Sequence, residues 1–156
     1  MSEQNPVVVR VKGSFRDAEG REDEILTVAR GRHYFHRDKH YVLYDDESLQ
    51  QGEKTPTILK IGRDAMTLLR RGTVEQEQRF ECGAEKCSMY RTPYGNINLA
   101  VRTEELVIHY DEGETAGMVD IRYDLFVNGA FQSSNMLHIE IEEDHGGGKR
   151  LCVDAP

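Results

Sequence analysis

The stretch that decides the fold is residues 117–143, GMVDIRYDLFVNGAFQSSNMLHIEIEE. Two runs within it alternate apolar and polar residues, which is the pattern of β-strands with one buried face and one wet face. Asn128-Gly129 separates the two runs, and this pair is a strong signal for a type I′ turn, which needs positive φ at both central positions. The stretch therefore predicts a hairpin of two long antiparallel strands.

The same period of two continues through the chain, as in Val7, Val9 and Val11, and turn signals punctuate it at 17–20, 93–95 and 112–114. The strands are expected near 6–15, 22–30, 32–37, 40–46, 56–62, 65–71, 76–82, 86–92, 96–103, 105–111, 117–128 and 131–143, with one helical turn at 47–51. Many antiparallel strands without crossover helices predict an all-β fold, a single antiparallel meander β-barrel of roughly 8–12 strands.

Length and composition indicate one domain. The chain has 156 residues, of which 38% are hydrophobic, and its mean hydropathy is -0.64. No apolar run approaches the roughly 20 residues that a membrane helix needs, and no apolar segment follows a basic start. We therefore expect neither membrane association nor a signal peptide, with a barrel domain over 1–145 and a flexible, glycine-rich tail over 146–156.

Charge argues against a nucleic-acid partner, because 20 Lys and Arg against 28 Asp and Glu leave a formal net charge of -8. The three cysteines, Cys82, Cys87 and Cys152, form a small odd set that favours reduced thiols and a cytoplasmic location. Cys82 and Cys87 flank a four-residue turn. Ordinary strand thiols are the favoured interpretation, with a disulfide or half of a metal site as the alternative.

Three histidines, His33, His36 and His40, invite a metal hypothesis. His33 and His36 would point to opposite faces of one strand, whereas His36 and His40 could face each other across a hairpin. Two imidazoles without a third convergent ligand make a weak site, so surface histidines and no metal are expected. No nucleophile–base motif is present in the sequence, and we predict neither catalytic residues nor a cofactor.

Several polar residues share the phase of apolar neighbours and are candidates for the barrel interior. The candidate ligand-binding residues are Arg70, Gln78, Tyr90, Tyr123, Asn135, Tyr44 and Glu47. A buried Arg70 would need a carboxylate, water or an anionic ligand, and Glu47 is the internal carboxylate we expect. The acidic cluster Asp45-Asp46-Glu47 either contributes to such a site or caps the turn that follows it. A polar network that fixes strand register is the alternative to a ligand site.

The sequence resembles the YwiB-like proteins, a bacterial family of unknown function, over roughly residues 6–143. The matching stretches are KHYVLY (39–44) with Glu47 after it, TILKI (57–61), LRRG (69–72), QRF (78–80), YRTPYG (90–95), YDL (123–125) and NM (135–136). The resemblance implies a lipocalin-like, calycin-type β-barrel. It implies no established reaction and no catalytic residues.

Two functions follow as hypotheses. A barrel of this size can hold one small ligand, which favours binding of a small hydrophobic, amphiphilic or anionic molecule inside it. The alternative is a protein-interaction module with a packed core, whose partner would meet the basic stretch 30–40 or the acidic rim. An enzyme is the less favoured hypothesis, because no nucleophile–base pair is evident.

Overall fold

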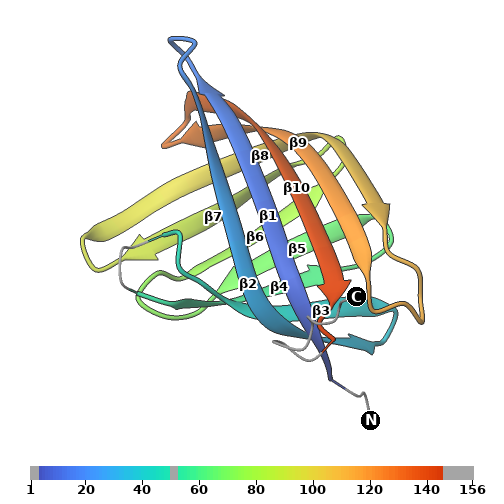
Figure 1. The fold of residues 1–156 in the computed structure, drawn as a ribbon. Coiled ribbons are helices and arrows are strands. Elements are labelled where there is room, and N and C mark those ends of the chain that lie inside the picture. The colour runs from blue at the N-terminus through green and yellow to red at the C-terminus, as the bar shows by residue number, and fades with distance from the viewer. Residues whose placement is uncertain (1–3, 50–52, 146–156) are drawn as a thin grey trace.

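The computed structural model describes residues 4–49 and 53–145, and these form ten β-strands in one antiparallel sheet (Figure 1). The strands are β1 (Asn5–Asp17), β2 (Glu22–His36), β3 (Lys39–Asp46), β4 (Thr55–Ile61), β5 (Ala65–Arg70), β6 (Gln76–Glu81), β7 (Glu85–Thr92), β8 (Gly95–His109), β9 (Gly117–Val127) and β10 (Ala130–Glu143). Their order is β6-β5-β4-β3-β2-β1-β10-β9-β8-β7. This confirms the predicted meander barrel, with the first and last strands paired.

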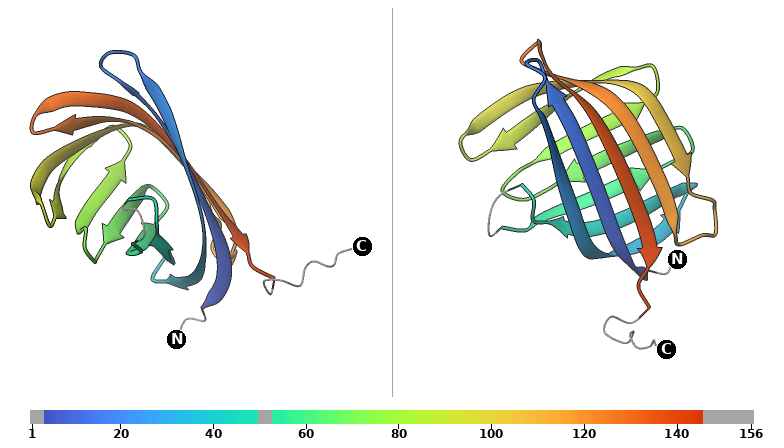
Figure 2. Two further views of the ribbon diagram at one scale, coloured as in Figure 1. Left: turned by 60° about the vertical axis from the view of Figure 1, so that its left-hand side comes forward. Right: turned by 45° about the horizontal axis from the view of Figure 1, so that its top comes forward.

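The sheet curves into a barrel that has two layers. The long strands β2, β1, β10, β9 and β8 form a strongly twisted layer, and the shorter β3 to β6 cross behind it (Figure 2). The barrel meets its own end between β6 and β7, where the described residues contain one backbone bridge, Glu75↔Arg91. We call this junction the β6–β7 seam.

Alternation along the strands places the core inside the barrel. Val9 of β1 pairs with Ile141 of β10, and the side chains of Val7, Val9, Ile139 and Ile141 are all buried. The opposite layer contributes Leu59, Ile61 and Met66 to the same hydrophobic cluster. Because the period is two, the residues that alternate with them, such as Arg10 and Glu140, point to the outer face.

Two hairpins turn on a pair of adjacent residues that both have positive φ. Asn128 and Gly129 have φ of 50° and 86°, which confirms the type I′ turn predicted from the Asn-Gly pair. Arg37 and Asp38, with φ of 51° and 66°, make a second turn of the same kind between β2 and β3. The sequence gives little warning of this second turn, because neither residue is glycine.

Two expected strand breaks were wrong. β2 continues through Gly31, where a Cβ would lie 2.4 Å from the Leu43 carbonyl oxygen. Glycine there allows the β3 backbone to approach rather than ending the strand. β8 continues through Glu104, because a register shift between Thr103 and Glu105 absorbs the change of phase as a β-bulge.

The expected helical turn was also wrong where it can be assessed, since residues 48 and 49 form a bend and residues 47–49 contain no helix. Residues 50 and 51 and the expected tail at 146–156 lie outside the described residues. Within the described part of the chain, no helix is long and apolar enough to cross a membrane.

Candidate functional site

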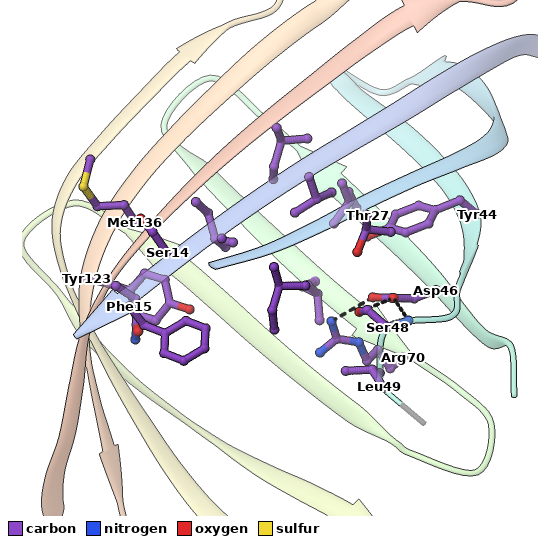
Figure 3. A pocket seen from close by; sticks show the side chains of 18 residues that line it. Ser14, Phe15, Thr27, Tyr44, Asp46, Ser48, Leu49, Arg70, Tyr123 and Met136 are labelled. Carbon is purple, nitrogen blue, oxygen red and sulfur yellow. Dashed lines mark hydrogen bonds and ion pairs between the residues drawn. The ribbon is translucent and has the colours of Figure 1, made fainter. Parts of the chain in front are cut away.

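The candidate site is a cavity of about 200 Å³ on the inner face of the barrel (Figure 3). Its walls are largely apolar, and two polar groups of side chains lie among them. The lining includes Tyr44, Asp46, Ser48, Leu59, Leu68, Arg70, Tyr123, Asn135 and Ile139. Ile25 and Met136 also line it and are substantially exposed, so the cavity reaches solvent beside β2 and β10.

Arg70 and Asp46 form an ion pair at one end of the cavity. Arg70 Nη2 lies 3.4 Å from Asp46 Oδ2, and the two side chains are 15% and 6% exposed. Asp46 Oδ1 also accepts hydrogen bonds from the Ser48 N–H at 2.8 Å and the Ser48 hydroxyl at 2.6 Å. The carboxylate expected from Glu47 therefore comes from Asp46, while Glu47 is exposed.

The alternation of side chains along β3 explains why Asp46, and not Glu47, faces Arg70. Val42, Tyr44 and Asp46 alternate along β3 and are all buried, so Asp46 is the acidic residue that shares the inner face. Glu47 follows the strand and lines a separate surface groove with Leu26 and Val28. Within the acidic cluster, Asp46 caps the bend through Ser48 and also forms the ion pair with Arg70.

Tyr123 and Asn135 lie at the other end of the cavity, on neighbouring strands β9 and β10. Asn135 Oδ1 accepts a hydrogen bond from the Ser133 hydroxyl at 3.0 Å. Burial raises the pKa of Tyr123 to about 12, and burial together with nearby Asp46 raises the pKa of Tyr44. Both phenols are therefore neutral at physiological pH and could act as hydroxyl donors or acceptors.

Two of the residues that line the cavity have a buried donor atom without a hydrogen-bond partner in the described part of the chain. Arg70 Nε and Asn135 Nδ2 have no hydrogen-bond partner among the described residues. An unpaired buried donor costs about 1–3 kcal/mol, and such groups are rare in folded proteins. The cavity therefore has a largely apolar wall, and the two residues that carry these unpaired donors belong to its lining.

Gln78 and Tyr90 do not line this cavity. Gln78 is buried at the β6–β7 seam, where its Nε2 donates to the carbonyl of Lys86 at 3.2 Å and its Oε1 accepts from Ser88 Oγ at 2.7 Å. Gln76 links this group to the cavity, because it accepts from Arg70 Nη1 at 3.0 Å and its Nε2 lies 3.3 Å from Ser88 Oγ. Tyr90 is half-buried on β7.

The histidines differ from expectation. His33 and His40 are each only 3% exposed, and His33 Nε2 lies 2.9 Å from His40 Nδ1. Both rings stack on Tyr110, with the His40 and Tyr110 centroids 3.7 Å apart. We call these three residues the histidine cluster. Surface placement was wrong for His33 and His40, and His36 is exposed opposite Lys39 rather than opposite His40.

Burial keeps the histidine cluster uncharged. Desolvation and then the neighbouring His40 lower the pKa of His33 to about 4. Desolvation also lowers the pKa of His40, against the backbone carbonyls of Tyr110 and Asp111, which act to raise it. In the described part of the chain, no group of three His, Cys, Asp or Glu residues could hold a metal ion.

Cys82 and Cys87 are free thiols on the surface, which removes the disulfide alternative for this pair. Cys82 Sγ instead lies 3.6 Å from the Glu104 carbonyl oxygen. Cys152 lies outside the described residues.

Known proteins match both the sequence and the fold. Residues 9–139 match the family model described as a domain of unknown function, DUF1934. The Bacillus subtilis (strain 168) "uncharacterized beta-barrel protein YwiB" is 29% identical over 127 residues, covering 81% of this chain and 86% of that protein. The crystal structure of ywiB protein from Bacillus subtilis matches with a TM-score of 0.81 at 26% identity, covering 92% of this chain and 95% of that one. With the family model spanning most of the barrel and the same fold in this relative, the chain belongs to the DUF1934 family.

Proposed function

We propose that the protein binds a small neutral amphiphile inside the barrel. The observation that carries this is the pair of buried, unpaired donors, Arg70 Nε and Asn135 Nδ2, on two residues that line a largely apolar cavity. Ligand sites are mostly apolar, with a few polar groups that fix orientation. Here the apolar body would pack on Leu59, Leu68 and Ile139, and a hydroxyl or carbonyl would meet the donors.

The size of the cavity limits the ligand. A dry cavity of about 150 Å³ in another protein accommodates benzene, so about 200 Å³ suits a ligand somewhat larger than a single ring. Because Ile25 and Met136 line the cavity and are exposed, a longer chain would extend past them into solvent.

The Arg70–Asp46 pair argues for a neutral polar group rather than an anion. Asp46 already balances the charge of Arg70, and an anionic ligand would place a second negative charge near that carboxylate. In a poorly solvated cavity such repulsion is weakly screened. We therefore expect neutral alcohols or amides to bind more tightly than carboxylates of equal length.

Octanol and octanoate test this preference. At a concentration ten times its dissociation constant, octanol would add about 1.4 kcal/mol to the free energy of unfolding, or about 3 °C in Tm, and octanoate less. Asp46→Asn should reverse the preference, because Arg70 is then uncompensated and a carboxylate can replace Asp46. Asp45→Asn is the matched control, since this exposed neighbour changes the same charge and should leave the preference unaltered.

Native mass spectrometry of freshly purified protein gives an independent check, with an adduct of small-molecule mass expected. The proposal fails if no adduct is found and neither compound shifts Tm. It also fails if Leu68→Phe, which would fill the cavity, raises Tm without changing binding of any compound. Equal responses of Asp46→Asn and Asp45→Asn would remove Arg70 as the anchor.

A further inference from the structure

Part of β2 is a sheet edge without a partner strand. β1 pairs with β2 along its length, from Arg16↔Glu22 to Asn5↔His33, but β3 pairs only with residues 31–36 of β2. Among the described residues, 22–30 therefore have no strand on their second side, and we call this segment the β2 free edge. It borders an open groove lined by Asp45, Glu47 and Ser48.

The middle of the β2 free edge is apolar and exposed. Ile25, Leu26 and Val28 are 45%, 67% and 56% exposed. Natural edge strands are usually protected by lysine, proline or a bulge. Residues 25–29 contain no charged residue or proline, and the β1–β2 register runs without a shift. An edge of this composition is suited to pairing with another strand.

The hydrogen bonds show which backbone groups face outward. The Asp17 N–H donates to the Arg21 carbonyl at 2.9 Å, so this pair is hydrogen-bonded between β1 and β2. Because bonding alternates along an antiparallel ladder, the odd-numbered residues of β2 bond to β1. Leu26 and Val28, with Glu24 and Arg30 beside them, therefore direct their N–H and C=O groups toward the free side.

The charges along the edge are self-complementary. Outward side chains follow the order Glu24, Leu26, Val28, Arg30, with the acid before the apolar pair and the base after it. If two copies meet antiparallel with Thr27 opposite Thr27, Leu26 lies opposite Val28, and Glu24 lies opposite Arg30. The two-fold axis repeats both pairs, as an isologous interface requires. Even-numbered residues also stay opposite even-numbered ones, so donors meet acceptors.

The charged residues remain available for such contacts. Glu24 Oε2 lies 3.9 Å from Lys12 Nζ, and Arg30 Nε lies 3.7 Å from Asp144 Oδ2. The Glu24 and Arg30 side chains are 66% and 73% exposed, and exposed pairs of this kind contribute little to stability. We propose that the β2 free edge pairs with the same edge of a second copy, which forms a sheet continuous across a homodimer.

Charge exchange tests the register. In Glu24→Arg, an arginine lies opposite Arg30 of the second copy, and in Arg30→Glu, a glutamate lies opposite Glu24 of the second copy. Each variant should therefore dimerise at least tenfold more weakly. An equimolar mixture of the two variants restores opposite charges at both ends, and it should recover a species of twice 17.9 kDa by sedimentation equilibrium. The double variant in one chain should recover it as well.

An apolar substitution provides a second comparison. Leu26→Lys should abolish the dimer, whereas Val107→Lys, at an exposed apolar position on β8, should not. Amide hydrogen exchange then locates the contact. The Leu26 and Val28 amides should slow as protein concentration rises, while the Thr27 and Ala29 amides, already bonded to β1, should not change.

Several outcomes would overturn the proposal. One is a monomer at all concentrations up to about 200 µM with fast exchange at Leu26 and Val28, since even a weak specific interface of this kind would be populated there. Another is a dimer unaffected by either charge reversal, which would have to use another surface. A dimer that Val107→Lys disrupts as strongly as Leu26→Lys would also contradict it.

Discussion

At the scale of single residues, the buried imidazoles of His33 and His40 make stability depend on pH. Their pKa values are lowered by burial, so the folded protein keeps them neutral while the unfolded chain binds protons below about pH 6.5. Stability is therefore complete above that value and decreases as the pH falls toward about 4, where His33 becomes protonated in the folded protein too.

We expect the free energy of unfolding to fall by about 2 kcal/mol between pH 6.5 and pH 5 through His33, at about 1.4 kcal/mol per pH unit. Urea titrations at both values measure this. His33→Gln should flatten the dependence, whereas His36→Gln, an exposed histidine of the same hairpin, should preserve it. Equal slopes in His33→Gln and the wild type would contradict this assignment.

His138 works in the opposite direction. The His138 ring donates hydrogen bonds to the Asp120 and Glu140 carboxylates, which raises its pKa, so its contribution is complete below about pH 6.5 and is lost as the pH rises through the folded value. Its contribution is therefore nearly constant at pH values well below 6.5. His138 and the buried pair therefore change the free energy of unfolding in opposite directions as the pH falls.

Gly31 shows how one residue permits a close approach of two strands. A Cβ at this position would lie 2.4 Å from the backbone oxygen of Leu43, and backbone cannot rotate away as a side chain can. We expect Gly31→Ala to destabilise the barrel by about 2 kcal/mol or more, measured by urea unfolding. In Gly62→Ala the nearest atom would be 3.6 Å away, so this control should change stability by at most about 0.5 kcal/mol. Similar losses in both variants would show that the Leu43 contact is not the cause.

At the scale of elements, side chains complete the β6–β7 seam where backbone pairing is sparse. The Gln78 side-chain amide forms hydrogen bonds to the Lys86 carbonyl and to Ser88 across this seam. These side-chain bonds take the place of the backbone bonds that join neighbouring strands elsewhere in the sheet. Such a group is costly to remove because its partners remain buried and unpaired.

We expect Gln78→Ala to lower the free energy of unfolding by about 2–4 kcal/mol, from lost hydrogen bonds and the space left behind. Amide exchange should accelerate in β6 and β7 before other strands. Glu77→Ala, on the outer face of the same strand, should have little effect. Uniform acceleration over all strands in Gln78→Ala would show that this residue does not act at the seam.

The sequence predicts elements better than it predicts contacts between them. Alternation and the Asn128-Gly129 turn identify strands and hairpins because both depend on neighbours within a few residues. Asp46 was missed as the partner of Arg70, although it shares the phase of Val42 and Tyr44, because the adjacent Glu47 has the same charge. The contact of His33 with His40 depends on the Arg37-Asp38 turn, which sets the register and has no glycine to signal it.

At the scale of the whole molecule, the described residues use one sheet for two tasks. The inner face holds a cavity with unsatisfied donors, and the outer edge of β2 presents unsatisfied backbone groups. Ile25 and Thr27 line the cavity and belong to the β2 free edge, so the two proposed sites meet at this strand. Charge variants at Glu24 and Arg30 change the edge alone, which allows the two proposals to be tested separately.

The pairing of β1 with β10 has a consequence for synthesis of the chain. β10, which pairs with β1, is the last of the ten strands to leave the ribosome. One side of β1 therefore stays unpaired while the other strands are made. Contacts between residues so distant in sequence slow folding, and an unpaired strand can meet the wrong neighbour. The nascent barrel is therefore most exposed to misassociation just before β10 emerges, when a chaperone would protect it most.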